Sequence, residues 1–326
     1  MIIGNKEYNM DSHHVYVMGI LNVTPDSFSD GGSFCNIDAA LKHVEQMIDE
    51  GADIIDVGGE STRPGHQQIS AEEESDRVSE VIAQVKSHFD IPVSIDTYKA
   101  PVARAAIEAG ADILNDIWGF RYERFNEEDP EKRKLHDVPE IAKVAASAGI
   151  PVILMYNDNL GRDISCRDEK IITSFLEANQ ERSAVELLSS IKEENVADRI
   201  VWGLRDSIRI AHRAGIKKDS IIVDPGIGFA KTQRENLLTM KNLKKIVRKV
   251  GYPMLLAASR KSMIGNALDL PVDQREEGTI VTTILAAEAD CRMVRVHDVA
   301  KNVRALKMLD AINESPLPPT YEVTQK

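Results

Sequence analysis

Residues 39–57 read AALKHVEQMIDEGADIIDV, and this stretch decides the fold. Its first part, 39–50, has the composition and length of a helix. Its last part, 53–57, is a short apolar run typical of a buried strand. Gly51 stands between the two, where a glycine can end a helix in the left-handed conformation and let a strand begin at once. The stretch therefore predicts a helix joined to a strand by a very short loop.

The same junction recurs at Gly110-Ala111-Asp112 and at Gly149-Ile150-Pro151. Short apolar runs alternate with helical stretches along the whole chain. Strands are expected at 15–21, 53–57, 92–95, 112–114, 151–155, 220–223, 253–257 and 293–296. Helices are expected at 39–50, 71–89, 101–109, 138–148, 196–214, 234–249, 276–288 and 300–312.

Eight such units indicate parallel strands with right-handed crossovers. Strands covered on both faces read as continuous apolar runs, as these do. The pattern favours an α/β fold, a (β/α)₈ TIM barrel in a single domain. An open, doubly wound sheet is the alternative that the pattern alone leaves open.

The domain limits follow from the outermost elements. We expect an N-terminal extension over 1–14, the barrel over 15–315 and a flexible tail over 316–326. The chain between strands five and six is longer than one crossover needs. An extra amphipathic helix is expected there at 171–191, within an insertion at about 158–195 on the outside of the barrel.

Composition excludes several classes of partner. The chain has 326 residues, with 40 Lys and Arg against 52 Asp and Glu, for a formal charge of −12. This balance argues against nucleic acid or an anionic membrane as partner. No apolar run is long enough to cross a membrane, and the start lacks a secretory signal. Three widely spaced cysteines suit a reducing compartment, so a cytoplasmic location is expected.

Polar residues gather where the predicted strands end. They are Asn22, Glu60 to Arg63, Asp96, Asn115, Asp116, Tyr156, Asn157, Asp224, Ser259 to Ser262, and Arg295 to Asp298. In a barrel these ends converge on one face, which holds the active site. One Asp or Asn after a strand is more often a helix cap or turn former. Polar residues at all eight strand ends favour a site instead.

These residues indicate a ligand with two chemical characters. One set offers carboxylate and amide oxygens to a ligand rich in N–H donors: Asp96, Asn115, Asp116 and Asp224. Another set offers positive charge to an anion: Arg63, Lys261, Arg295 and His297. Arg295 lies inside an apolar strand, where an unpaired charge is costly.

Other motifs carry less weight. The glycine-rich segment 224–229 matches neither a P-loop nor a dinucleotide fingerprint. Zinc-protease and esterase motifs are absent from the sequence. Ser259, Ser262 and His297 could supply a nucleophile and a base. Because no third residue to orient them is identifiable, acyl transfer is disfavoured.

Two long motifs resemble the signatures of a known family. Residues 19–32 (GILNVTPDSFSDGG) and 56–65 (DVGGESTRPG) are similar to the first two signatures of the dihydropteroate synthases. Shorter matches follow in the family's order at 94–97, 114–116, 224–229, 259–262 and 295–299, so the resemblance spans about 15–312. It implies a (β/α)₈ enzyme that joins 6-hydroxymethyl-7,8-dihydropterin diphosphate to 4-aminobenzoate and releases diphosphate.

The resemblance also implies a role for each matching residue. The catalytic candidates are Asp96, Lys261, Arg295 and His297. Asn115, Asp116 and Asp224 would bind the pterin together with Asp96 and Lys261. Diphosphate would lie at Asn22, Arg295 and His297, with the cofactor Mg²⁺ near Asn22. The aminobenzoate pocket would comprise Thr62, Arg63, Pro64, Phe229 and Ser262, and Phe28 would belong to a mobile first loop. A homodimer is expected.

One position departs from the family pattern, and two rival functions remain open. The family commonly has Met-His after strand five, where this chain has Met155-Tyr156. A pterin-dependent methyltransferase of the same barrel family would share the pterin contacts. It would not need residues 61–65 or 259–262. A non-catalytic pterin-binding paralogue is the second rival.

Overall fold

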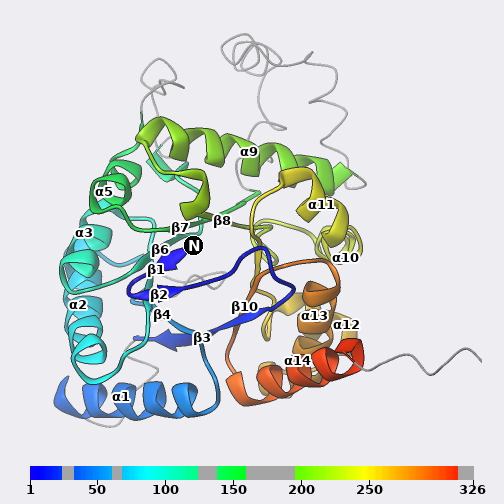
Figure 1. Cartoon of the computed structure of the whole chain (residues 1–326), viewed down its shortest axis with the longest axis horizontal. Coiled ribbons are helices and arrows are strands. Elements are labelled where there is room, and N and C mark those ends of the chain that lie inside the picture. Colours follow the sequence, from blue (N-terminus) through cyan, green and yellow to red (C-terminus); the bar gives the residue numbers. More distant parts are fainter. Residues whose placement is uncertain (24–32, 61–67, 124–137, 159–194, 315–326) are drawn as a thin grey trace, which may run out of the picture.

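The computed structural model of the chain describes residues 1–23, 33–60, 68–123, 138–158 and 195–314 (Figure 1). Its parallel strands are β3 (Tyr16–Asn22), β4 (Ile54–Gly58), β5 (Val93–Asp96), β6 (Ile113–Asp116), β7 (Val152–Met155), β8 (Ile221–Asp224), β9 (Leu255–Leu256) and β10 (Met293–Val296). Their order in the sheet is β8-β7-β6-β5-β4-β3-β10-β9. A parallel bridge between Val223 and Met254 joins β8 to β9 and closes the barrel. The predicted (β/α)₈ fold is confirmed, and closure excludes the open sheet.

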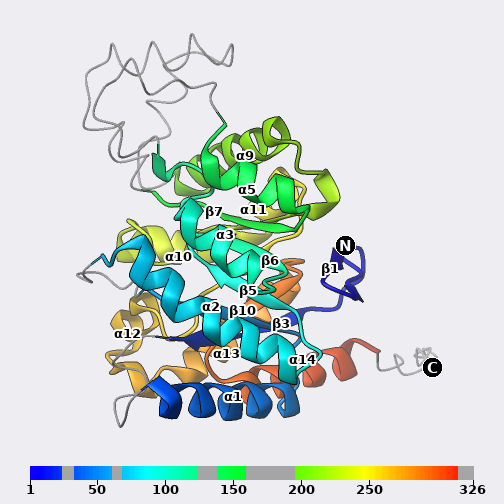
Figure 2. The ribbon, with the colours of Figure 1, turned by 90° about the vertical axis from the view of Figure 1, so that its left-hand side faces the viewer.

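Helices surround the strands on the outside (Figures 1 and 2). They are α1 (Ser33–Asp49), α2 (Ala71–His88), α3 (Ala100–Glu108), α5 (Glu140–Ala148), α9 (Val196–Ala214), α10 (Gln233–Lys241), α11 (Leu243–Val250), α12 (Ser262–Leu268), α13 (Glu276–Glu288) and α14 (Val299–Glu314). Short 3₁₀ turns lie at Lys218–Ser220 and Val272–Gln274. None of the described helices is both long and apolar enough to cross a membrane.

Two helical predictions were wrong in detail, and one helix was missed. The helix expected at 39–50 begins six residues earlier, at Ser33. The single helix expected over 234–249 is interrupted at Asn242, whose side-chain amide donates to the carbonyl oxygen of Leu238 at 2.8 Å. Asparagine competes with the helix for backbone hydrogen bonds in this way. α12 was not predicted, because its sequence was interpreted only as a polar strand end. The expected helix at 171–191 and the tail at 316–326 lie outside the described residues.

The glycine junctions have the predicted conformation. Gly51 has φ of +99° before β4, and Gly110 has φ of +110° before β6. L-residues other than glycine rarely adopt such angles. Each helix therefore ends abruptly, and the following strand returns directly into the barrel.

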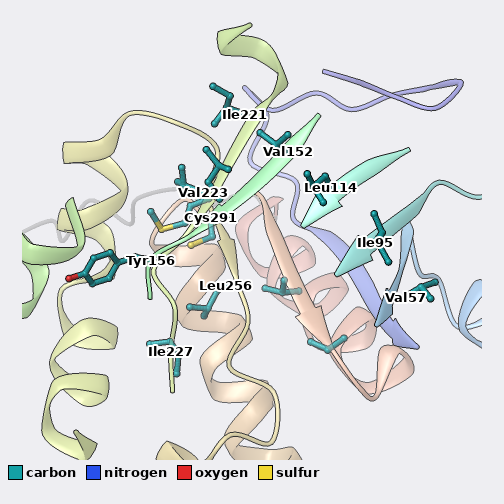
Figure 3. Close-up of a cluster of buried hydrophobic side chains, with 14 of the residues drawn as sticks. Val57, Ile95, Leu114, Val152, Tyr156, Ile221, Val223, Ile227, Leu256 and Cys291 are labelled. Atoms are coloured by element: carbon teal, nitrogen blue, oxygen red, sulfur yellow. The ribbon is translucent and has the colours of Figure 1, made fainter. Parts of the chain in front are cut away.

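Side chains alternate along each strand between the helices and the barrel interior. Val57, Ile95, Leu114, Val152 and Val223 lie on the helix-facing side and are fully buried (Figure 3). The other side carries a separate apolar cluster at the N-terminal end of the barrel. It comprises Met18, Ile54, Ile113, Ile153, Ile222, Leu255, Ala257 and Met293 together with Ile3 and Tyr8. This interior is a packed core, as in other barrels.

An N-terminal hairpin covers that end of the barrel (Figures 1 and 2). Its strands are β1 (Ile2–Ile3) and β2 (Lys6–Glu7), which pair antiparallel. Ile3 is fully buried, and the Tyr8 hydroxyl donates to the Asp53 carbonyl oxygen at 2.9 Å. The sequence did not predict this hairpin. Since apolar side chains fill the N-terminal end, the polar residues of the predicted strand ends lie toward the opposite end of the interior.

Candidate active site

Four neighbouring strands bring polar residues to one level of the barrel. In register, Asn22 pairs with Gly58, Gly58 with Asp96, and Asp96 with Asn115. Along their strands these positions lie an even number of residues from the interior residues Met18, Ile54 and Ile113. Because side chains alternate between the two faces, they too point toward the barrel axis. The predicted convergence of strand ends on one face is therefore present in the structure.

Arg295 lies between two carboxylates inside the barrel. Its Nε donates to Oδ2 of Asp56 at 2.5 Å, and its Nη2 donates to Oδ2 of Asp96 at 2.8 Å. Asp56 is fully buried and also accepts from Nδ2 of Asn115, at 3.3 and 3.4 Å. Buried charges need such partners to offset the loss of hydration. β4, β5, β6 and β10 are thus linked by one polar group of side chains.

Asp56 was not among the predicted site residues, although it opens the second family motif. The alternation of side chains along β4 could have identified Asp56 as a residue of the interior. Asp56 stands between Ile54 and Gly58 on the interior side of β4, where a carboxylate requires a cation. Its partner Arg295 stands at the corresponding interior position of β10, two residues after Met293.

The Asp96 carboxyl has a raised pKa and one oxygen free to accept a hydrogen bond. Burial raises the pKa of its carboxyl from 3.8 to about 7, opposed by Arg295 and reinforced by Asp56, Glu74 and Asp116. Its Oδ1 is buried and has no hydrogen-bond partner among the described residues. A buried acceptor without a partner is costly unless a ligand supplies a donor. Asp96 can therefore accept an N–H from a molecule bound in the barrel.

Lys261 and Asp224 stand on the other side of the interior. The Lys261 ammonium donates to the Ile227 carbonyl oxygen at 2.5 Å and lies 4.7 Å from the centroid of the Phe229 ring. Burial lowers the pKa of Lys261 to about 8, opposed mainly by Asp224. Burial likewise raises the pKa of Asp224, and Lys261 is the strongest opposing group. Each of the two charges therefore stabilises the ionised form of the other.

An aromatic and apolar wall lies beside these polar groups. Tyr98, Ile117, Trp118 and Met155 form one buried cluster, against which Tyr122 and Phe229 pack. Met155 reaches it from the interior side of β7. Ligand pockets combine such apolar surface with a few convergent polar groups. The combination suits a flat heterocycle with N–H donors at its edge.

His297 is held by Ser259. The Ser259 hydroxyl lies 2.9 Å from Nδ1 of His297, and the His297 backbone N–H donates to the same oxygen at 3.2 Å. The hydroxyl accepts the backbone proton, so its own proton is available to Nδ1. Ser262 does not share this arrangement, because it begins α12 and is exposed.

Asn22 is half-buried at the end of β3. A Cβ atom built on Gly58 would lie 3.8 Å from Oδ1 of Asn22 and 3.8 Å from Oδ2 of Asp96. The glycine therefore leaves space between these two oxygens. The described residues contain no group of three His, Cys, Asp or Glu side chains suited to a metal ion. Any cation here would need further ligands from substrate or water.

Asp116 occupies a different place from Asn115. It lies two residues after Leu114, which faces the helices, so Asp116 also stands on the helix-facing side of β6. Its Oδ1 accepts from the Trp118 N–H and its Oδ2 from the Phe120 N–H, both at 2.8 Å. Burial raises the pKa of Asp116 to about 6, and these two hydrogen bonds oppose the shift. Both oxygens therefore bind the loop that carries Trp118.

Tyr156, at the position where the family commonly has histidine, also faces the helices (Figure 3). Its hydroxyl donates to Oδ1 of Asp158 at 2.5 Å. Its ring packs so closely on α9 that a Cβ on Gly203 would lie 2.2 Å from Cε2. Because its side chain points away from the interior, this departure leaves the interior polar group intact.

The remaining predicted residues lie outside the described residues: Phe28, Thr62, Arg63 and Pro64. Glu60, directly before them, is firmly held. Its Oε1 accepts from the Tyr98 hydroxyl at 2.6 Å. Its Oε2 accepts from the Ile69 N–H at 3.0 Å and from the Lys99 ammonium at 2.7 Å. Glu60 thus joins the two flanks of residues 61–67.

Known proteins share both the sequence and the fold. A family model described as pterin binding enzyme matches residues 18–297. The dihydropteroate synthase of Clostridium beijerinckii is 49% identical over 313 residues, which cover 96% of this chain and 99% of the relative. A dihydropteroate synthase structure from Clostridium difficile, determined in the presence of pteroic acid, is 39% identical, with a TM-score of 0.74, and the match covers 93% of this chain and 98% of that one. The Xanthomonas albilineans dihydropteroate synthase with 4-aminobenzoic acid is 33% identical, with a TM-score of 0.75 and coverage of 93% and 94%. The chain belongs to the dihydropteroate synthase family of pterin-binding enzymes.

Proposed function

We propose that this transferase condenses 6-hydroxymethyl-7,8-dihydropterin diphosphate with 4-aminobenzoate, forming 7,8-dihydropteroate and diphosphate. The observation that carries the proposal is the set of charges in the barrel interior: Arg295 is hydrogen-bonded to Asp56 and Asp96, and Asp224 interacts electrostatically with Lys261. Related dihydropteroate synthases were solved with pteroic acid and with 4-aminobenzoic acid.

The pterin would occupy the barrel interior beside the apolar wall. Asp96 and Asp224 would accept N–H groups from its ring edge, Asn115 would contact it through its amide, and Lys261 would donate to a ring acceptor. A site that pairs buried donors and acceptors in this way rejects ligands that lack them. The unpartnered Oδ1 of Asp96 supports this placement.

Diphosphate would lie at the cationic side of the interior, where Arg295 and His297 end the last strand. Asn22 would offer its amide oxygen to Mg²⁺, whose other ligands would be phosphate oxygens and water. Such a sparse protein contribution is usual for this ion at phosphate sites. When bound, Mg²⁺ would supply positive charge to the leaving group.

The reaction would proceed by departure of diphosphate before the amine attacks. The bond between the pterin methylene carbon and the diphosphate oxygen breaks, and positive charge spreads into the pterin. Asp96, ionised and shielded from water, would stabilise that charge, while Arg295 and His297 stabilise the departing anion. The aminobenzoate nitrogen then bonds to the methylene carbon and releases a proton.

The aminobenzoate pocket would comprise Thr62, Arg63, Pro64, Phe229 and Ser262, with Phe28 in a loop that covers it. Phe229 and Ser262 flank Lys261, which supports a second substrate close to the pterin. Asp116 would act on the substrate indirectly. Its carboxylate positions the loop that carries Trp118, so we assign it to pocket geometry.

A homodimer is also proposed, through α13 and α14. These helices lie side by side (Figure 1) and are joined by a hydrogen bond from Thr283 to Asn302. They expose large apolar side chains: Val281, Leu285, Met308 and Ile312, at 41 to 61%. Apolar patches of this kind mark interfaces. Sedimentation of the wild type and of Met308→Glu tests this, with a monomeric wild type contradicting it. A cytoplasmic location, without nucleic-acid or membrane partners, completes the proposal.

The deciding experiment measures 7,8-dihydropteroate formed from pterin diphosphate and labelled 4-aminobenzoate. Product is expected from the wild type, and a loss of activity from Asp96→Ala and Lys261→Ala with folding intact. Titration calorimetry with Mg²⁺ should show 4-aminobenzoate binding only after diphosphate is present. Methyl transfer to a corrinoid would favour the methyltransferase. Tight pterin binding without turnover would favour a non-catalytic paralogue.

A further inference from the structure

The Lys231 ammonium lies between the loops that follow β7 and β8. It donates to three backbone carbonyl oxygens: Gly226 at 2.8 Å, Phe229 at 3.3 Å and Tyr156 at 3.3 Å. It also lies 4.9 Å from the centroid of the Tyr156 ring. An ammonium has three donors, so these carbonyls satisfy all of them.

The backbone of the β8 loop is folded around this ammonium. Gly226, Gly228 and Ala230 have φ of +70°, +83° and +51°. The left-handed conformation at Ala230 is unfavourable for a residue with a side chain and requires support from its surroundings. A Cβ on Gly226 would lie 2.0 Å from the Tyr156 carbonyl oxygen and 3.3 Å from the Lys231 ammonium. The two loops and the lysine therefore fit together closely.

The same loop positions the predicted site residues. The Gly226 N–H donates to Oδ1 of Asp224 at 2.6 Å. The Ile227 carbonyl oxygen accepts from the Lys261 ammonium at 2.5 Å, and the Phe229 ring lies beneath that ammonium. Each contact depends on the path of residues 226–229, which Lys231 holds at both ends.

We propose that Lys231 is a positioning residue, whose ammonium fixes the β8 loop and thereby the orientation of Asp224, Phe229 and Lys261 in the pocket. It acts through the loop and does not touch the substrate. Burial lowers the pKa of Lys231 to about 7, with Asp158 and Asp224 opposing the shift, which agrees with a water-poor position. The effect on turnover rests on the proposed function, whereas the effect on the loop does not.

The test compares Lys231→Met with a matched variant, Lys218→Met. Lys218 also lies over a tyrosine ring, 5.7 Å from the centroid of Tyr252, but belongs to the 3₁₀ turn that precedes β8, at the opposite end of that strand from the β8 loop. Hydrogen exchange of residues 224–231 is measured without substrate, and kcat and KM are measured for both substrates. If Lys231→Met does not fold, Lys231→Gln, which keeps N–H donors without charge, is used instead.

We expect faster exchange in residues 224–231 of the Lys231 variant and a loss in kcat/KM for pterin diphosphate of about tenfold or more, since small misplacements at a site are costly. Lys218→Met should change neither. Unchanged exchange in the Lys231 variant overturns the inference, as does faster exchange with unchanged kcat/KM. A wild type that makes no product overturns the proposed function instead, because the exchange measurement needs no turnover.

Discussion

Nη2 of Arg295 donates to Oδ2 of Asp96 at 2.8 Å, which joins β10 to β5 across the inside of the barrel. The two residues are 199 positions apart in the chain. This contact places a carboxylate beside a guanidinium in the barrel interior, where Arg295 opposes the rise in the pKa of Asp96 that burial causes. Activity and stability should both depend on this pair and on the groups next to it.

The ionisation of Asp96 predicts the pH dependence of activity. Its carboxyl has a pKa of about 7 and must be ionised to stabilise positive charge on the pterin. We expect kcat/KM, which reports the free enzyme, to rise as pH passes about 7. Asp96→Asn should have low activity and lack this rise. A variant that keeps the same pH profile would assign the ionisation to another group.

The same pKa predicts how stability varies with pH. The folded chain retains the Asp96 proton up to about pH 7, whereas the ordinary pKa is 3.8. Its contribution to the free energy of unfolding is therefore fully present below pH 3.8, falls as pH rises and is lost above about pH 7. Between pH 5 and 8, urea unfolding should show the wild type losing about 2–3 kcal/mol more than Asp96→Asn. Equal losses would contradict this shift.

Asp56 should matter for both stability and activity. Asp56→Ala leaves Arg295 without one of its two carboxylates in the barrel interior. Removing one partner of a buried ion pair costs about 3 kcal/mol or more where the other charge is left alone. Because Asp96 still pairs with Arg295, a loss of about 2 kcal/mol is expected here. Urea unfolding measures the loss, and product formation should fall with it. Asp90→Ala, at an exposed carboxylate, is the control and should change stability by about 0.5 kcal/mol at most.

Asn115 and Asp116 are adjacent but should behave differently. Asn115→Ala removes an interior amide, so calorimetry should show weaker pterin binding. Its loss of stability should be smaller than that of Asp116→Ala, because its hydrogen bonds to Asp56 are long, at 3.3 and 3.4 Å. Asp116→Ala leaves the Trp118 and Phe120 N–H groups without acceptors, which costs about 1–3 kcal/mol each. Its main effect should be on stability. The reverse pattern would show that Asp116 contacts the ligand.

Ser259 should act through His297. Ser259→Ala removes the hydroxyl beside Nδ1, and we expect the affinity for diphosphate to fall by about tenfold, as for other partners that orient a histidine. Ser259→Thr keeps the hydroxyl and should restore most of it. The ¹⁵N shifts of His297 would report the change of tautomer. Unaltered shifts in Ser259→Ala would mean that another group orients the ring.

Much of the architecture could be predicted because it is local. Apolar runs and the glycines at 51 and 110 defined strands and junctions whose bounds agree with the structure within about two residues, the uncertainty usual between assignments. Alternation along a strand also distinguishes Asn115, on the interior side, from Asp116, on the helix-facing side. The side of the strand on which each residue lies could thus be inferred from the sequence. The prediction grouped Asn115 with Asp116 because it considered residue type alone.

Contacts between distant elements could not be predicted in this way. The hairpin at residues 2–7 is too short for periodicity to reveal. It is stabilised by Ile3 and Tyr8, which pack among side chains from several distant strands. Lys231 resembled any lysine before a helix, since its three carbonyl partners come from two loops. Alternation after Val152 and Leu154 places Tyr156 on the helix-facing side, but the sequence did not show that its partner there is α9.

The sequence by itself determined the alternation of strands and helices, the side of its strand on which each residue lies and the set of polar residues at the strand ends. These depend on backbone geometry and on neighbours a few positions away. Only the tertiary structure decided which charges pair, as Arg295 does with Asp56 from 239 positions away. Barrel closure and strand register bring such residues within hydrogen-bond distance, and both are properties of the whole chain.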